Sequence, residues 1–335
     1  MSDEPEHIAV IRFSSLGDIV TTGPAVRALK ARFPDSNLVY VTTTPYNDLA
    51  AALPGVDEVV ALRRRGEGFR EDAARLVEMG PRSRVADLQG SSRSAKLVKL
   101  LDAHQVVTEK PPRLRRTLLL ATRIRFGDFL AVPDRMVGRL AEWGVQGDDG
   151  SLQLDIPDEV TSEVERRWGD RVRGAVVLVT GAKHETKRWP DTYWRELLDL
   201  LPPDKPVVVL GGKGEFPASF AGLAGERVLD LTGATGILQA AALLKLASLV
   251  ISGDTGPMHL AVAAGTPLVA MYGPTVREFG FYPYKHDRSV VLERKLVCRP
   301  CSAHGSARCP LGHHKCMREI TPRMVSDAAA DLNLW

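Results

Sequence analysis

Short runs of aliphatic and β-branched residues alternate with longer amphipathic segments along most of the chain. This alternation is typical of βα units that build a mostly parallel sheet. In the first half it predicts strands at 8–13, 38–43, 56–62, 85–89 and 105–108. Between and after these strands it predicts helices at 19–32, 46–53, 69–79 and 94–101.

The second half repeats this rhythm after a Gly- and Asp-rich segment, 144–157, which has no helical period and is predicted to link two domains. Strands are predicted at 175–180, 206–210, 228–231, 249–252 and 267–271, and a terminal helix at 322–335. The sequence therefore predicts an α/β fold of two Rossmann-like domains whose parallel sheets face each other across a cleft. Ligands are expected in that cleft, at the carboxyl ends of the strands.

These elements predict three parts of the chain. An N-terminal Rossmann-like domain is placed at 1–157, and a C-terminal Rossmann-like domain at 158–320. The last helix, at 321–335, is treated as separate, with the N-terminal domain as its candidate packing surface.

Composition narrows the classes of function. The 335 residues are about twice the usual size of one domain, which fits two cores. The 44 Lys and Arg are nearly balanced by 41 Asp and Glu, which argues against a nucleic-acid partner. No uninterrupted apolar run reaches the ~18 residues of a membrane-spanning helix, and the acidic N-terminus differs from a signal peptide. We therefore expect a cytoplasmic protein.

Asp18 is the first candidate for chemistry. The first predicted strand runs through Ser14-Ser15-Leu16-Gly17-Asp18 directly into a helix. Gly17 permits a tight turn there and places Asp18 at the mouth of the cleft. The carboxylate could simply cap the helix by accepting backbone N–H bonds. It could also act as the general base for a hydroxyl nucleophile.

A second strand–turn–helix signal is Ser252-Gly253-Asp254-Thr255-Gly256-Pro257. Its glycines permit close approach of the backbone to a ligand, Thr255 can cap the helix, and Pro257 falls where no N–H is needed. Such a turn presents free amides to an anion, so it is a candidate phosphate site. The alternative is an ordinary capped connection between a strand and a helix.

Two loops at the same edge of the second domain add candidate nucleotide contacts. Lys183, Lys187 and Arg188 follow its first strand, where a diphosphate needs cations, although charged loops are usually only solvated. The next loop, 211–215, is rich in glycine but lacks the dinucleotide spacing, so Gly212 and Glu215 are weaker candidates. No P-loop or nucleophile-elbow motif occurs, which argues against those two enzyme classes.

Residues 82–125 carry a local excess of positive charge. The segment holds eleven Lys and Arg but only three Asp and Glu. Most runs of this kind are solvated faces. The alternative is attraction to an anionic acceptor or to an anionic lipid surface.

All four cysteines lie in one short segment, at Cys298, Cys301, Cys309 and Cys316. This spacing could close a tetrahedral zinc site, so a structural zinc is a candidate. A catalytic metal is disfavoured, because four thiolates would leave no open coordination position. The same spacing is compatible with buried or free thiols and, under oxidising conditions, with disulfides.

Several segments together resemble glycosyltransferase family 9, the ADP-heptose:lipopolysaccharide heptosyltransferases. They are IRFSSLGDIV at 11–20, VADLQG at 85–90, KRWP at 187–190 and SGDTGPMHL at 252–260. The stretch CPLGHHKCM at 309–317 is also similar to a tail found in part of this family. The resemblance covers nearly the whole chain.

The resemblance implies a GT-B architecture and an inverting transfer of heptose from ADP-heptose to the growing inner core of lipopolysaccharide, without a catalytic cofactor. It implies that Asp18 is the base, that the N-terminal domain at 1–157 binds the acceptor, and that the C-terminal domain at 158–320 binds the nucleotide-sugar donor. It also implies a peripheral enzyme at the cytoplasmic face of the inner membrane, with an anionic glycolipid as acceptor.

The donor residues follow from the same resemblance. Lys187 matches the lysine that contacts the donor phosphates, and the donor-holding turn matches Asp254, Thr255 and Gly256, with His259 in the same segment. Lys183 is a further candidate donor contact. Ala182 and Lys183 stand where heptosyltransferases often carry hydroxyl residues, which leaves the preferred nucleotide and sugar open.

Three other functions are open from the sequence. They are a family-9-like enzyme for another nucleotide sugar, a nucleotide-binding oxidoreductase, and a glycan-binding protein without turnover. The oxidoreductase is disfavoured, because G-x-G-x-x-G is missing after the first strand.

Overall fold

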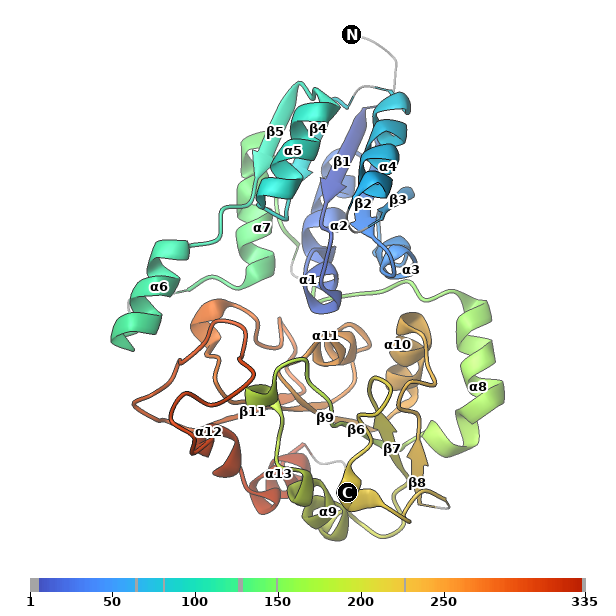
Figure 1. Ribbon diagram of the computed structural model, residues 1–335. Helices are drawn as coiled ribbons and strands as arrows, with labels where there is room; N and C mark the ends of the chain where they lie inside the picture. The colour runs from blue at the N-terminus through green and yellow to red at the C-terminus, as the bar shows by residue number, and fades with distance from the viewer. Residues whose placement is uncertain are drawn as a thin grey trace. The chain divides into compact units, whose positions relative to one another are not determined.

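The computed structural model describes residues 6–63, 66–80, 82–125, 129–148, 150–225 and 227–332. They form two compact units, each with its own parallel sheet (Figure 1). Unit 1 comprises Met1–Pro112 and Leu130–Asp155, and unit 2 comprises Arg113–Phe129 and Ile156–Trp335.

Unit 1 contains a five-stranded parallel sheet in the order β3-β2-β1-β4-β5. Its central strands are buried on both faces, which explains why they read as continuous apolar runs. The strands are β1 (His7–Ile11), β2 (Asn37–Thr43), β3 (Glu58–Leu62), β4 (Arg84–Asp87) and β5 (Gln105–Thr108). The helices are α1 (Leu16–Val20), α2 (Gly23–Arg32), α3 (Asn47–Ala51), α4 (Glu67–Glu78), α5 (Ser92–Leu101) and α7 (Val132–Leu140), followed by the 3-10 turn η1 (Ala141–Trp143).

Unit 2 contains a six-stranded parallel sheet in the order β11-β10-β9-β6-β7-β8. The strands are β6 (Val176–Val179), β7 (Val207–Leu210), β8 (Val228–Asp230), β9 (Leu249–Gly253), β10 (Leu268–Tyr272) and β11 (Ser289–Glu293). The helices are α6 (Arg113–Thr122), α8 (Asp158–Val172), α9 (Asp191–Leu200), α10 (Ile237–Leu246), α11 (Gly256–Ala263), α12 (Lys315–Arg318) and α13 (Pro322–Ala330). Three 3-10 turns complete it: η2 (Glu185–Lys187), η3 (Ala218–Phe220) and η4 (Arg277–Phe279).

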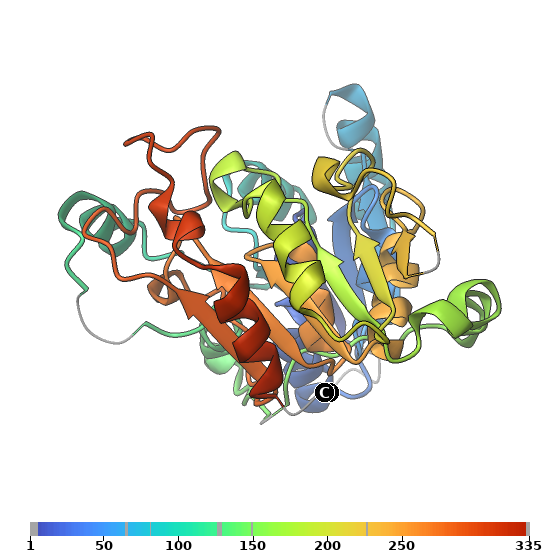
Figure 2. The ribbon, with the colours of Figure 1, turned by 90° about the horizontal axis from the view of Figure 1, so that it is seen from below.

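The helices cover the sheets as amphipathic layers. In unit 1, apolar residues of α4 and α5 pack on those of β1, β2 and β4. In unit 2, α9 and α13 lie side by side over the strands, as Figure 2 shows. Their apolar residues, among them Trp194 of α9, join Trp189 in one core cluster of this unit. None of the described helices is long and apolar enough to cross a membrane.

Each sheet has one point at which the strand order reverses. In unit 1 this switch lies between β1 and β4, and in unit 2 it lies between β6 and β9. Open α/β sheets bind their ligands beyond the carboxyl ends of the strands at such a point. The loops after these four strands are therefore where each unit should carry its chemistry.

The predicted helix 19–32 is two helices, α1 and α2. Pro24 lies in the first turn of α2, where its missing N–H costs no hydrogen bond. The proline therefore starts a helix instead of continuing one. The pattern also failed to predict α6, α7, α9, α10 and β11.

The predicted linker 144–157 belongs mostly to unit 1. Val145 and Leu152 are buried, and the Asp155 amide donates to the Ala52 carbonyl at 2.8 Å. The chain passes to unit 2 for the last time at Ile156.

Two segments belong to a different part of the molecule than we expected. Helix α6 lies inside the predicted N-terminal domain, but it is part of unit 2, because Leu119 is buried against Val276 and Phe279. The terminal helix α13 contacts α9, β10 and β11 and belongs to unit 2. Residues 333–335 of this predicted helix lie outside the described residues.

Candidate functional site

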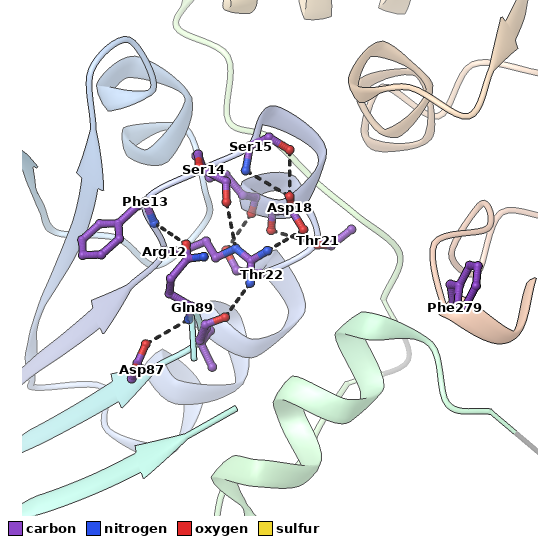
Figure 3. Close-up of polar contacts among 12 residues, drawn as sticks. Arg12, Phe13, Ser14, Ser15, Asp18, Thr21, Thr22, Asp87, Gln89 and Phe279 are labelled. Atoms are coloured by element: carbon purple, nitrogen blue, oxygen red, sulfur yellow. Dashed lines mark hydrogen bonds and ion pairs between the residues drawn. The ribbon is translucent and has the colours of Figure 1, made fainter. Parts of the chain in front are cut away.

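Asp18 lies just beyond the carboxyl end of β1, where it pairs with Arg12 (Figure 3). Arg12 Nη2 donates to Asp18 Oδ1 at 2.5 Å. The other oxygen, Oδ2, accepts from the Ser15 amide at 3.0 Å and from the Ser15 hydroxyl at 2.7 Å. The Asp18 side chain is 22% exposed, so a ligand can reach a carboxylate that is held at both oxygens.

These contacts refine the capping interpretation. Ser15 is the N-cap of α1, and Asp18 is the third helical residue, whose carboxylate reaches back to the N-cap amide. Asp18 therefore supports the start of the helix without being its cap. Gly17, a weaker candidate, is buried inside α1 and not in the turn before it.

Arg12 and Gln89 connect the loops on the two sides of the switch point. Arg12 Nη1 donates to the Leu88 carbonyl at 2.6 Å, and Gln89 Oε1 accepts from the Phe13 amide at 3.0 Å. Figure 3 shows Arg12 reaching from the end of β1 toward both Asp18 and the loop after β4. The two loops therefore form one polar cluster.

Asp87, at the end of β4, is a structural carboxylate. It is 1% exposed, and its Oδ1 accepts from the amides of Gln89 and Gly90 at 3.0 Å each. Its Oδ2 accepts from the Ser94 hydroxyl at 2.8 Å. Burial raises the pKa of Asp87, although these hydrogen bonds oppose the rise. Asp87 holds the loop that carries Gln89 and is too buried to act as the base.

In unit 2, Lys187 and Asp254 form an ion pair across the switch point of the second sheet. Lys187 Nζ lies 2.6 Å from Asp254 Oδ2 and donates to the Asp254 carbonyl at 3.2 Å. Thr275 Oγ1 donates to the same carboxylate oxygen at 2.7 Å. Only 15% of the Lys187 side chain and 9% of the Asp254 side chain are exposed. The lysine is therefore held at a fixed place beside the start of α11.

Thr255 and Gly256 begin helix α11. Thr255 is the N-cap residue, but its hydroxyl pairs with Ser252 Oγ at 3.1 Å and does not cap a helix amide. Pro257 occupies the first turn. The first amides of a helix have no acceptor within it, so this end of α11 can bind an anion.

Glu215 connects the loops after β6 and β7. Its Oε2 accepts from the Gly212 amide at 2.7 Å, and its carbonyl accepts from the Thr180 hydroxyl at 2.7 Å. A Cβ on Gly181 would lie 1.8 Å from Glu215 Oε2, so this approach requires glycine at 181. The two weaker candidates, Gly212 and Glu215, are thus in direct contact within the loop after β7.

A cavity of about 520 Å³ opens beside Glu215. Neither Lys187 nor Asp254 lines it, so the cavity and the ion pair are separate features of this edge. Its lining combines charged groups with aromatic rings: Thr180, Gly181, Glu185, Arg188, Trp189, Pro190, Asp191, Trp194, Gly214, Glu215, Phe216, Pro217, Ala218, His314 and Arg318.

Lys183 and His259 differ in accessibility. Lys183 is exposed and makes no ion pair with any described residue. His259 is only 4% exposed on α11, with its ring edge toward Phe281. Burial lowers the pKa of His184, and Lys183 and Lys187 lower it further. The loop after β6 is therefore electropositive.

The four cysteines are free thiols, of which Cys316 is buried. Burial raises the pKa of Cys301 and raises that of Cys316 to about 11. Within the described ranges, no three Cys, His, Asp or Glu side chains are arranged to hold a metal ion. The candidate structural zinc site, which would use Cys298 and Cys309 as well, is therefore not supported.

Sequence reasoning assigned no role to Arg12, Gln89 or Thr275. Arg12 and Gln89 follow two strands that pair as neighbours, so the pairing of 8–13 with 85–89 would have brought them together. Nothing in the sequence marked Thr275, because its contact with Asp254 depends on the path of the chain after β10.

Known proteins match both the sequence and the fold. The sequence model of glycosyltransferase family 9 (heptosyltransferase) matches residues 82–311. Lipopolysaccharide heptosyltransferase 1 of Pseudomonas aeruginosa is 27% identical over 315 residues, covering 88% of this chain and 85% of that protein.

Solved structures share the architecture along nearly the whole chain. A family 9 glycosyltransferase from Veillonella parvula has a TM-score of 0.80 at 21% identity and covers 98% of this chain and 97% of its own. The Escherichia coli ADP-heptose lipopolysaccharide heptosyltransferase II has a TM-score of 0.77 at 23% identity and covers 98% of each chain. These likenesses confirm the predicted α/β GT-B fold. The family's sequence model matches more than half of this chain, so the chain is a glycosyltransferase and belongs to glycosyltransferase family 9.

Proposed function

We propose that this chain is an inverting heptosyltransferase, which transfers heptose from ADP-heptose to the inner core of lipopolysaccharide. One observation carries the proposal: each unit places a charged cluster at the switch point of its own sheet, Arg12–Asp18 in unit 1 and Lys187–Asp254 in unit 2. The names of two relatives support ADP-heptose as donor and lipopolysaccharide as acceptor. One is a lipopolysaccharide heptosyltransferase, and the other is an ADP-heptose lipopolysaccharide heptosyltransferase.

Asp18 is the proposed general base. Its carboxylate takes the proton from an acceptor hydroxyl while that oxygen attacks the anomeric carbon of the heptose. The new C–O bond forms on the face opposite the diphosphate, and the bond to the diphosphate breaks, so the configuration inverts. Arg12 and Ser15 each bind one carboxylate oxygen and so fix the orientation of the base.

Lys187 and the start of α11 are the proposed diphosphate site. The ammonium group, the amides near Thr255 and Gly256, and the helix dipole all favour negative charge. Asp254 is an anion and would repel a diphosphate, so we assign it the role of positioning Lys187. These groups stabilise the ADP that leaves, and we therefore expect that catalysis requires no cofactor.

Glu215 is the proposed nucleoside contact. Its carboxylate lines the cavity, together with Thr180 and Gly181, next to the loop that carries Lys187. A carboxylate accepts hydrogen bonds from the paired hydroxyls of a ribose. The exposed Lys183 adds long-range attraction for the phosphates. His259, which is buried in the first turn of α11, is the remaining proposed donor residue.

The proposed acceptor is an anionic glycolipid, which places the enzyme in the cytoplasm at the surface of the inner membrane. The excess of Lys and Arg between residues 82 and 125 supports this location, because cations attract anionic lipid surfaces. Nucleic acid is not an expected partner.

The test is transfer from radiolabelled ADP-heptose to an inner-core oligosaccharide, followed by NMR analysis of the new linkage. We expect a labelled product whose anomeric configuration is opposite to that of the donor. A panel of other nucleotide sugars and nicotinamide cofactors serves as control. Preference for another donor would overturn the heptose assignment, and a retained configuration would overturn the inverting mechanism. Glycan binding without transfer from any donor would overturn the assignment of this reaction to the chain.

A further inference from the structure

Helix α6 carries apolar residues on two sides. On one side, Leu119 is fully buried and packs with Val276 and Phe279. On another side, Leu114 and Leu118 are 75% and 45% exposed. Residues four apart share one face of a helix, and the next residue is turned by about 100°. Leu114 and Leu118 therefore form an open stripe that is distinct from the packed side.

The packed side fixes the direction of this stripe. Arg116 lies over the rings of Phe279 and Phe281, at 5.9 Å from each centroid, and its Nη2 donates to the Phe279 carbonyl at 3.3 Å. Leu120 packs against the same cluster as Leu119. Rotation of α6 to bury the open stripe would break these contacts. The exposure of the two leucines is thus built into unit 2.

Positive charge surrounds the open stripe. From residue 110 to residue 125 the sequence contains six Lys and Arg and no Asp or Glu. Arg113, Arg115 and Arg123 are exposed. Exposed leucines beside arginines are typical of helices that lie in the interface of an anionic bilayer.

The loop after β11 carries another exposed apolar side chain. Val297 is 97% exposed, and Ala303 of the same loop packs against the Leu119 cluster. Arg123 also lies close enough to Cys301 to oppose the rise in the pKa of that thiol. The loop and α6 are therefore neighbours within unit 2.

We propose that the open stripe of α6 docks on an anionic phospholipid bilayer, with Leu114 and Leu118 among the acyl chains and the flanking arginines against lipid phosphates. The inference deepens the proposed function, which places the acceptor in a membrane, and rests on it for its purpose. Charge complementarity selects the occupant, because the exposed Arg113, Arg115 and Arg123 lie on the same segment as the two leucines and fit a sheet of phosphates.

The experiment is flotation of the full chain with vesicles that contain phosphatidylglycerol and, separately, with vesicles of phosphatidylcholine alone. The wild type is expected to bind the first and not the second. L114E/L118E should lose at least about tenfold in partitioning, because both apolar anchors become anions. Arg123→Gln should lose about fivefold, the value of one arginine near such a surface. Leu200→Glu, at a residue that is 40% exposed at the end of α9, is the matched control and should bind like the wild type.

Two further measurements separate this inference from the proposed function. L114E/L118E should keep the melting temperature, the affinity for ADP and the transfer rate to a delipidated acceptor. The docking surface would be overturned, even if transfer is normal, by either of two results. One is wild-type binding to vesicles that does not depend on phosphatidylglycerol, and the other is flotation of L114E/L118E with the vesicles. If the chain binds an acidic protein through Leu114 and Leu118 but does not bind vesicles, the partner of the open stripe is a protein, and the lipid bilayer is overturned as its occupant. Vesicle binding without any transferase activity would sustain the surface and overturn the proposed function alone.

Discussion

Arg12 Nη2 and Asp18 Oδ1 lie 2.5 Å apart at the point where β1 gives way to α1. The pair lies beside the loop after β4, because Arg12 also donates a hydrogen bond to the Leu88 carbonyl of that loop. The two residues therefore have separable roles in the proposed reaction. Asp18 exchanges the proton, and Arg12 holds the carboxylate in place.

The first prediction concerns Asp18. Asp18→Asn should lower kcat by at least about 10², because an amide cannot accept the proton of the acceptor hydroxyl. The affinity for ADP should stay near the wild-type value, since Asp18 belongs to unit 1, whereas the residues proposed to bind the diphosphate belong to unit 2. Steady-state kinetics and calorimetry with ADP measure the two effects. Asp48→Asn, in the first turn of α3, is the matched control. Normal turnover of Asp18→Asn would remove it from the role of base.

The second prediction separates positioning from chemistry at Arg12. Arg12→Gln should reduce kcat by about tenfold or more while the KM for the donor stays constant. Arg12→Lys should recover part of the rate, because it keeps the charge next to Asp18. Both variants leave the Leu88 carbonyl without its partner, which should lower the free energy of unfolding by about 1–3 kcal/mol. A stability loss with an unchanged kcat would assign Arg12 a purely structural role.

The third prediction compares two lysines of the same loop. Lys187→Ala should weaken ADP binding by about tenfold to a hundredfold, the value of a charge-assisted hydrogen bond to a phosphate. Lys183→Ala should have a much smaller effect, because Lys183 is exposed. Calorimetry at low and high salt distinguishes the two, since only the Lys183 contribution should vanish with screening. Equal effects would contradict the special position of Lys187.

The fourth prediction uses the close approach of Gly181 and Glu215. Gly181→Ala places a Cβ where Glu215 Oε2 now lies, so the flexible carboxylate must move away. If Glu215 binds the nucleoside, ADP affinity should fall in Gly181→Ala about as much as in Glu215→Gln. The double variant should then show little further loss. Additive losses would mean that the two residues act independently.

The fifth prediction concerns the thiol of Cys316. Burial raises its pKa to about 11, so at pH 8 only about one part in a thousand is thiolate, the form that reacts. In the folded protein, iodoacetamide should label Cys316 very slowly at pH 8 and faster as the pH rises toward the pKa. Mass spectrometry after labelling, with and without denaturant, gives the rate. Rapid labelling of the folded chain at pH 8 would contradict the buried, protonated thiol.

The sequence predicted the strands well, because buried parallel strands are continuous apolar runs bounded by loops, as at 8–13 and 249–252. The family resemblance and the positions of loop residues also identified the clusters around Asp18 and Lys187. Contacts that depend on three-dimensional paths could not be predicted in this way. Thr275 reaches Asp254 from the loop after β10, which pattern analysis does not locate.

Helix α6 was missed for a different reason. Its sequence, RLRRTLLLAT, stood out as part of a run of positive charge, and only one of its leucines, Leu119, is buried. Its membership of unit 2 depends on one buried leucine and its aromatic neighbours. Such a contact between distant segments leaves no periodic signal in a single sequence.

Residues 113–129 belong to unit 2 although they lie between two segments of unit 1, and this affects how the enzyme can be divided into fragments. A single scission between Pro157 and Asp158 would leave α6 on the N-terminal fragment and strip Leu119 from Val276 and Phe279. The C-terminal fragment would then expose the apolar surface that α6 covers, and would tend to aggregate. Chimeras that exchange halves between members of the family must therefore transplant this helix together with the residues beneath it.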